Sequence, residues 1–197
     1  MQQQKYIQLL ADALIPLLGF FFWDWNLYFI VLFYFIDAVS ALVFSHIEAY
    51  QIQGVQKKLN NSWLIVGGMT SLMLLITILL THLILLKIIP TIQFKQELIA
   101  FWQYEDMGFP QGYLLIPLLI FAGYQRYKME FLIPKMAERI PMKIHWKKQA
   151  SAYSVLVGVL LLTYLLTQFI VFTETVYVLA LIIGLSGAGF LRLKFFN

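Results

Sequence analysis

Two carboxylates lie in apolar segments that contain few other charged side chains: Asp12 lies before Trp23, and Asp37 lies after Leu27. Ionisable side chains inside membrane helices are costly and often mark ion or proton paths. Asp12 and Asp37 are nearly equidistant in sequence from Trp25. In two helices joined there, both would lie about 18 to 20 Å from the turn. In one interpretation, the two carboxylates meet across the hairpin and share a proton or a cation.

A second interpretation of the same carboxylates is structural. Asp12 would be hydrated near the far end of its helix, and Asp37 would be neutral and hydrogen-bonded to Ser40, Tyr34 or a neighbouring helix, as polar groups between membrane helices often are. The sequence leaves both interpretations open. The ion-binding candidates, which include a polar path from Asp37 towards the cytoplasm, are Asp12, Asp37, Ser40, His46 and Glu48.

The segments that carry these residues are typical of membrane helices. The chain is 61% hydrophobic and 12% charged, whereas soluble domains have about 25% charged residues. A membrane helix needs about 20 apolar residues. We therefore predict an all-α, polytopic transmembrane helical bundle, with residues 1–197 forming a single membrane domain. Its six expected spans are about 7–23, 27–46, 62–86, 112–124, 150–172 and 176–191.

The distribution of Lys and Arg predicts the orientation of the bundle. When alternate loops are assigned to one side, Lys87 and Lys95 fall opposite all the other basic residues. Cytoplasmic loops of membrane proteins carry the excess of Lys and Arg. We therefore expect both termini in the cytoplasm, the 23–26 turn and the 87–111 loop outside, and a location in a bacterial cytoplasmic (inner) membrane.

The 125–149 loop is the most basic part of the chain. Its charge has two readings, a topology signal that needs no ligand and a binding site for anionic lipid head groups. Because topology accounts for the basic residues, the net charge of +4 does not indicate a nucleic-acid partner. The candidate head-group ligands are Arg126, Lys128, Lys135, Arg139, Lys143, Lys147 and Lys148.

The sequence offers little for catalysis. It has no cysteine, and its three histidines fall at two predicted heights, so neither a metal site nor a cofactor is indicated. Residues 184–187 spell G-x-S-G, which resembles the serine motif of rhomboid intramembrane proteases. No histidine follows Ser186 to act as the general base. The small residues there are more typical of close helix packing with a partner or a second copy, and an enzyme is the least favoured class.

The first hairpin resembles an uncharacterised family of small bacterial multi-pass membrane proteins. The shared features are a Leu-Pro-rich first helix, here Ile15 and Pro16, a Trp before the second helix, here Trp25, and an aromatic residue followed by an acid, here Tyr34 and Asp37. The acid of that pattern is usually Glu, so Asp37 departs from it. The resemblance covers about forty residues and implies no activity.

Two functions are consistent with these features. The first is a proton- or cation-coupled transport module, in which the intramembrane carboxylates bind the ion and Pro16 and Pro117 interrupt helices beside cavities. The second is a structural or accessory subunit without transport or catalytic activity, in which small-residue faces bind a partner. The first predicts water near Asp37, and the second predicts a stable complex.

Overall fold

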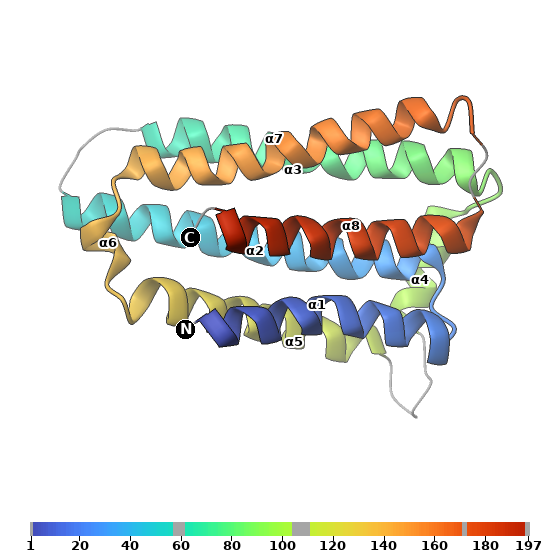
Figure 1. Ribbon diagram of the computed structural model, residues 1–197, viewed down its shortest axis with the longest axis horizontal. Coiled ribbons are helices and arrows are strands. Elements are labelled where there is room, and N and C mark those ends of the chain that lie inside the picture. Colours follow the sequence, from blue (N-terminus) through green and yellow to red (C-terminus); the bar gives the residue numbers. More distant parts are fainter. Residues whose placement is uncertain (1, 57–61, 104–110, 171–172, 196–197) are drawn as a thin grey trace.

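The structure is almost entirely helical (Figure 1). The computed structural model describes residues 2–56, 62–103, 111–170 and 173–195, with side chains described at 10, 13–56, 64, 67–103, 113–170 and 173–185. No strand occurs in these parts, which confirms the predicted all-helical class. The helices are α1 (Gln2–Phe22), α2 (Leu27–Gln56), α3 (Ser62–Ile88), α4 (Phe94–Gln103), α5 (Gln111–Tyr127), the π-helical η1 (Lys128–Leu132), α6 (Met136–Arg139), α7 (Met142–Leu166) and α8 (Glu174–Phe195).

Each of the six apolar runs found in the sequence falls largely within one long helix. Three helices in the described part are long and apolar enough to cross a membrane, namely α2, the Gly67–Ile88 part of α3, and α7. Ala13–Phe22 of α1 and Glu174–Leu185 of α8 are shorter apolar helices. The described part of the chain is therefore helical and contains three helices with the length and composition of membrane spans.

Two helices extend beyond the apolar runs that predicted them. α2 continues ten residues past His46, and α7 begins at Met142, directly after Pro141, whose extended backbone precedes the first turn. At 1.5 Å per residue α2 is about 45 Å long, whereas the hydrocarbon core of a bilayer is about 30 Å thick. The polar last turns of α2 and the basic first turns of α7 therefore extend past the apolar segments.

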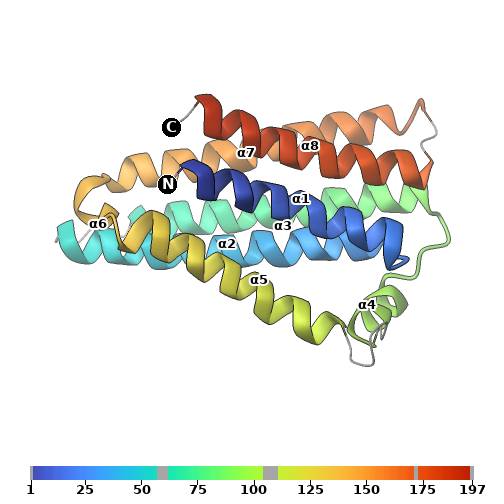
Figure 2. The same cartoon turned by 60° about the horizontal axis from the view of Figure 1, so that its bottom comes forward.

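The long helices run roughly side by side, so the molecule has two ends (Figure 1). The α4 end contains α4 and the turns that join α1 to α2 and α7 to α8. The α6 end contains α6, the last turns of α2 and the first turns of α7. α1 begins and α8 ends in the half of the molecule that carries α6 (Figures 1 and 2).

Helix α2 lies at the centre of the bundle. It contacts each of the other seven α-helices, while α3 packs mainly on α7 and α1 mainly on α8 (Figure 2). All side chains of residues 27–33 are buried, as expected of a helix that is apolar on every face. Farther along α2, Val39, Val43 and Ile47 are exposed, so the tightest packing lies at the α4 end.

Residues 23–26 form a tight turn at the α4 end. The backbone N–H of Trp25 donates to the carbonyl of Gly19 over 2.9 Å, and Asp24 has a φ of 49°, a left-handed conformation common after a helix end. The Trp25 ring lies directly on Gly19, where a Cβ would be 2.3 Å from the ring. Asn26 then caps α2, because its Oδ1 accepts the N–H of Phe29 over 2.9 Å.

Acidic side chains of two other helices also bind the start of α2. Glu97 of α4 accepts a hydrogen bond of 2.7 Å from the side-chain amide of Asn26. Glu174, at the start of α8, accepts the backbone N–H of Leu27 over 3.0 Å. Because the first N–H groups of a helix lack intrahelical partners and carry partial positive charge, carboxylates stabilise this end. These contacts hold α4 and α8 in place beside α2.

Candidate functional site

Asp37, in the apolar part of α2, pairs with a cation from α5. Its Oδ1 lies 3.6 Å from Nη2 of Arg126, and the two side chains are 25% and 30% exposed. The sequence placed Arg126 among the head-group candidates and did not foresee this pairing. The backbone of Asp12 is helical in α1, but its side chain lies outside the described ones, so a meeting of Asp12 with Asp37 stays a prediction.

Arg126 reaches along α5 towards the α4 end to make this contact. Its neighbour Tyr127 bonds through its hydroxyl to the side chain of Gln51, which lies fourteen residues after Asp37 in α2, about 21 Å in an α-helix. Two adjacent residues of α5 thus contact widely separated residues of α2. The Arg126 side chain therefore extends towards the apolar segments, opposite to the outward direction that long basic side chains favour near helix ends.

Ser40 and His46 lie on α2 between Asp37 and Glu48. Ser40 is 6% exposed, and its hydroxyl has no hydrogen-bond partner among the described residues. Its Oγ lies close to α5, because a Cβ on Gly123 would be 2.5 Å from it. His46 donates from Nδ1 to the carbonyl of Leu42 over 2.9 Å. A polar path through these two residues stays a prediction, because these contacts connect them to neither acid.

Glu48 lies beyond the apolar part of α2 and faces α7. Its Oε2 is 3.6 Å from Nδ1 of His145, and the side chains of Glu48 and His145 are 19% and 6% exposed. Nε2 of His145 lies 3.1 Å from the carbonyl oxygen of Ser45. The amide of Gln149 donates to the Ser45 hydroxyl over 2.8 Å. Half-buried Glu48 and buried His145 thus form a polar cluster between the last turns of α2 and the first turns of α7.

Burial and neighbouring charges shift the ionisation of both residues. Desolvation raises the pKa of Glu48 to about 7, with a further contribution from the charge of Glu130 and an opposing one from Lys148. Desolvation lowers the pKa of His145, although its hydrogen bond to Ser45 opposes this shift. Both groups therefore favour their neutral forms relative to the same groups in water.

Several polar side chains of α3 form hydrogen bonds within their own helix. Along the buried face of α3, the hydroxyls of Thr70, Thr77 and Thr81 donate to the carbonyls of Gly67, Met73 and Thr77 over 2.8 to 2.9 Å. His82 donates to the carbonyl of Ile78 over 2.8 Å and lies among the rings of Tyr28, Phe35 and Phe94. These hydrogen bonds satisfy the donor groups of these α3 side chains without a partner from another helix.

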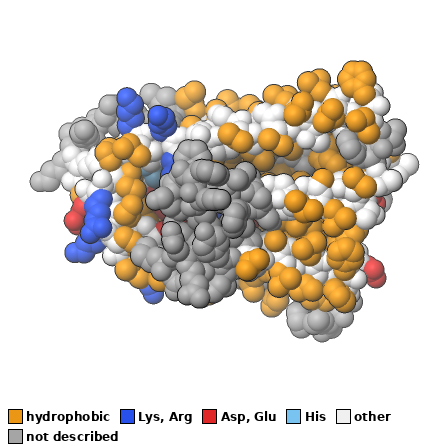
Figure 3. All heavy atoms as spheres, viewed as in Figure 1, with side chains coloured by type: hydrophobic (Ala, Val, Ile, Leu, Met, Phe, Trp, Pro, Cys, Tyr) orange, Lys and Arg blue, Asp and Glu red, His pale blue; other side chains and the backbone are white. Residues whose placement is uncertain are grey.

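The basic residues of the 125–149 loop gather at the α6 end (Figure 3). Lys128, Lys135, Arg139, Lys143, Lys147 and Lys148 are exposed, whereas Arg126 is directed towards Asp37. Apolar side chains stand among them, with Ile133 60% and Ile144 57% exposed. On the face shown in Figure 3, hydrophobic side chains cover much of the remaining described surface. The α6 end therefore presents exposed basic and exposed apolar side chains together.

Sequence reasoning missed His145 and the role of Arg126. Both lie in the basic loop, where their charge matched a topology signal, and neither shows a periodicity that identifies a partner. Ser45, which His145 contacts, is 100 residues away in the chain.

Among the described residues, no group of three or more His, Asp or Glu side chains could hold a metal ion. The resemblance of the first hairpin to a bacterial family stays a prediction. No family model matches the chain, and neither a curated protein nor a solved structure does.

Proposed function

We propose that this chain is a multi-pass protein of a bacterial cytoplasmic membrane that couples the binding of a proton or cation to a rearrangement of its helices. The observation that carries the proposal is the ion pair between Asp37 and Arg126, with a separation of 3.6 Å. The carboxylate belongs to the apolar part of the central helix, and its cation comes from a different helix. Ionisable groups at such positions are costly and usually functional.

The mechanism follows from competition for one carboxylate. In the paired state Arg126 neutralises Asp37. When Asp37 binds a proton or a small cation instead, the attraction that draws Arg126 into the apolar region is lost. Arg126 then moves towards the head groups, where a guanidinium is better solvated. Because Arg126 lies at the end of α5, this exchange shifts α5 against α2 and couples ion binding to helix movement.

The proposed protein crosses the membrane six times. The three long apolar helices support three crossings. We place α1, α5 and α8 as the others, because each contains one of the remaining apolar runs and contacts α2. The exposed Lys and Arg at the α6 end support a cytoplasmic position for that end. They also support binding of anionic lipid head groups, with Ile133 and Ile144 inserted between them.

A second candidate function is an accessory subunit. It is favoured by α7, in whose apolar part few side chains are fully buried. One face of α7 presents Ser151, Val155, Gly158 and Leu162 to the surroundings, and a Cβ on Gly158 would meet nothing within 4 Å. A face with small residues suits close packing against a helix of another protein or of a second copy. In this case the Asp37–Arg126 pair would join α2 to α5 without ion movement.

The experiment that tests coupling is a current measurement on the purified chain in proteoliposomes. Capacitive currents are recorded after pH jumps and after jumps in a panel of monovalent and divalent cations. Wild type should give a transient current with at least one ion, and Asp37→Asn should abolish it. Asp24→Asn is the matched control, because it makes the same chemical change in the exposed turn at the α4 end, and it should retain the current.

Two outcomes would contradict the proposal. If folded wild type gives no current with any ion, coupling is absent for the tested ions and the accessory role is favoured. If Asp37→Asn keeps the full wild-type current, the ion binds elsewhere.

A further inference from the structure

The contact between Glu48 and His145 has an unusual chemical requirement. A backbone carbonyl oxygen can only accept a hydrogen bond, so Nε2 of His145, 3.1 Å from the carbonyl of Ser45, must carry a hydrogen. A neutral imidazole has one N–H. Nδ1 of neutral His145 is then a lone-pair acceptor, and it faces Oε2 of Glu48 at 3.6 Å.

Two acceptors that face each other repel unless a proton lies between them. Neutral His145 opposite an ionised Glu48 would place a lone pair against a carboxylate in a site that is largely removed from water. One added proton makes the contact favourable, either as a carboxylic acid that donates to Nδ1 or as an imidazolium beside a carboxylate. A second added proton would leave a charged imidazolium facing a neutral acid. The geometry therefore favours one added proton for the pair.

We propose that Glu48 and His145 form a single-proton binding site at the α6 end, which takes up and releases its proton and so controls the contact between α2 and α7. As a step in ion coupling, the site rests on the proposed function. It would make the proton the coupling ion and the α6 end the place where the proton exchanges with the adjoining water.

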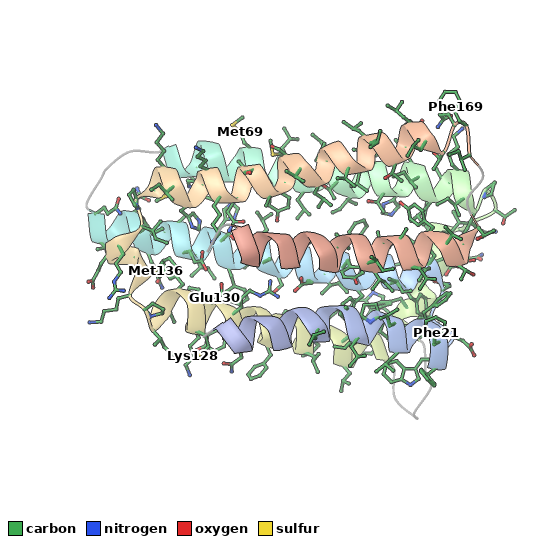
Figure 4. The ribbon with its side chains drawn as sticks, viewed as in Figure 1. Phe21, Met69, Lys128, Glu130, Met136 and Phe169 are labelled. Carbon is green, nitrogen blue, oxygen red and sulfur yellow. The ribbon has the colours of Figure 1, made fainter. Side chains whose placement is uncertain are left out.

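The surrounding groups set the affinity of this site. Glu130 of η1, whose position at the α6 end is shown in Figure 4, and Tyr127 of α5 both interact electrostatically with Glu48. The cation of Lys148, in α7, favours the ionised Glu48 and disfavours a charged His145, and the charge of His46 also disfavours a charged His145. Burial of the pair raises the pKa of Glu48 to about 7, so the proton can leave within the physiological range.

Loss of the proton would act directly on the contact between α2 and α7. His145 and Gln149 belong to α7, and both bond Ser45 in α2. When the proton leaves, repulsion between Nδ1 and the Glu48 carboxylate opposes the same contact that these bonds maintain. The first turns of α7 then separate from α2, and the basic loop that precedes α7 moves with them. Protonation restores the contact.

The test is a pH titration of the full chain in lipid nanodiscs with ¹³C-carboxyl-labelled glutamate and ¹⁵N-labelled histidine. One glutamate signal should titrate near pH 7. It should be absent in Glu48→Gln and unchanged in Glu138→Gln, which removes an exposed carboxyl of α6. In wild type above pH 8, one histidine should show a protonated Nε2 and a bare Nδ1, and this pattern should disappear in His145→Gln.

The result that would overturn the site is a Glu48 signal that titrates near 4.5, the ordinary value, or a His145 that carries its proton on Nδ1. The wild-type spectra give this result even if a variant fails to fold. The titration is independent of current measurements. A Glu48 that titrates near neutral pH in a protein without proton current leaves the site intact and contradicts coupling, whereas a proton current with an ordinary Glu48 contradicts only the site.

Discussion

Arg126 at the end of α5 places Nη2 3.6 Å from Oδ1 of Asp37, although the next residue, Tyr127, bonds Gln51 much farther along α2. The two contacts together fix how far α5 is displaced along α2. They also give the central helix a neutralised charge within its apolar part. The ion pair thus connects α2 to α5 in this state. Under the proposed mechanism, ion binding to Asp37 breaks this connection.

The interaction between Asp37 and Arg126 should be measurable as a coupling energy in a double-mutant cycle. Asp37→Asn and Arg126→Gln should each destabilise the protein, because each leaves a partly buried charge without its partner. The double variant should lose less stability than the sum of the losses in the two single variants. For a pair with this exposure we expect a coupling energy of about 0.5 to 1 kcal/mol. Unfolding in mixed micelles, followed by tryptophan fluorescence, gives all four stabilities. The control cycle combines Asp37→Asn with Lys128→Gln, and in it the two losses of stability should add. Additive losses in the cycle of Asp37 and Arg126 would contradict the interaction between these two residues.

The turn at the α4 end depends on a glycine under an indole. Gly19→Ala places a methyl group 2.3 Å from the Trp25 ring, so we expect a loss of about 1 to 3 kcal/mol, typical of overpacking. Gly54→Ala is the matched control, because this exposed position of α2 has nothing within 4 Å of a new Cβ. There the helix should gain up to about 1 kcal/mol from the better propensity of alanine. Equal effects in the two variants in the same unfolding assay would contradict the described turn.

The Glu48–His145 pair predicts a specific dependence of stability on pH. Between pH 4.5 and 6.5, the ordinary values, the folded pair holds one proton and the unfolded chain holds one on His145, so the pair contributes no slope. As pH rises from 6.5 through about 7, only the folded state still holds a proton, and stability falls. Below 4.5 the unfolded chain holds two protons, and stability falls as the pH decreases.

Single variants should separate the two contributions. In Glu48→Gln only the lowered pKa of His145 remains, so stability falls as pH drops through 6.5. In His145→Gln only the raised pKa of Glu48 remains, so stability falls as pH rises from 4.5 towards 7. Each slope should approach about 1.4 kcal/mol per pH unit. Taking the difference in stability between each variant and wild type cancels the contribution of the other titrating groups. Identical profiles of stability against pH for all three proteins would contradict the Glu48–His145 pair.

The sequence predicted the helical class because six long apolar runs have few structural solutions in a chain this hydrophobic. The polar ends of two helices gave no such signal. The last ten residues of α2 and the first turns of α7 are helical without being apolar, so a search for hydrophobic runs ended α2 near His46 and began the fifth helix at Ala150 instead of Met142.

The candidate site was predicted in part. The cost of charge in apolar segments singled out Asp37, and Glu48 was included through helical spacing. Their partners Arg126 and His145 lie about 90 to 100 residues farther along the chain, and their pairing depends on how α5 and α7 pack against α2. Helical periodicity fixes which face of a helix a residue occupies, but it does not fix which other helix meets that face.

The most direct test of the account is the side of the membrane on which each end of the bundle lies. The chain has no cysteine, so single cysteines can be introduced at exposed positions, Gln93 and Thr173 at the α4 end and Lys143 at the α6 end. A membrane-impermeant maleimide should label Gln93→Cys and Thr173→Cys in intact spheroplasts, and Lys143→Cys only after lysis. Labelling of Lys143→Cys in intact spheroplasts together with the other two would contradict a bundle that crosses the membrane between its α4 and α6 ends.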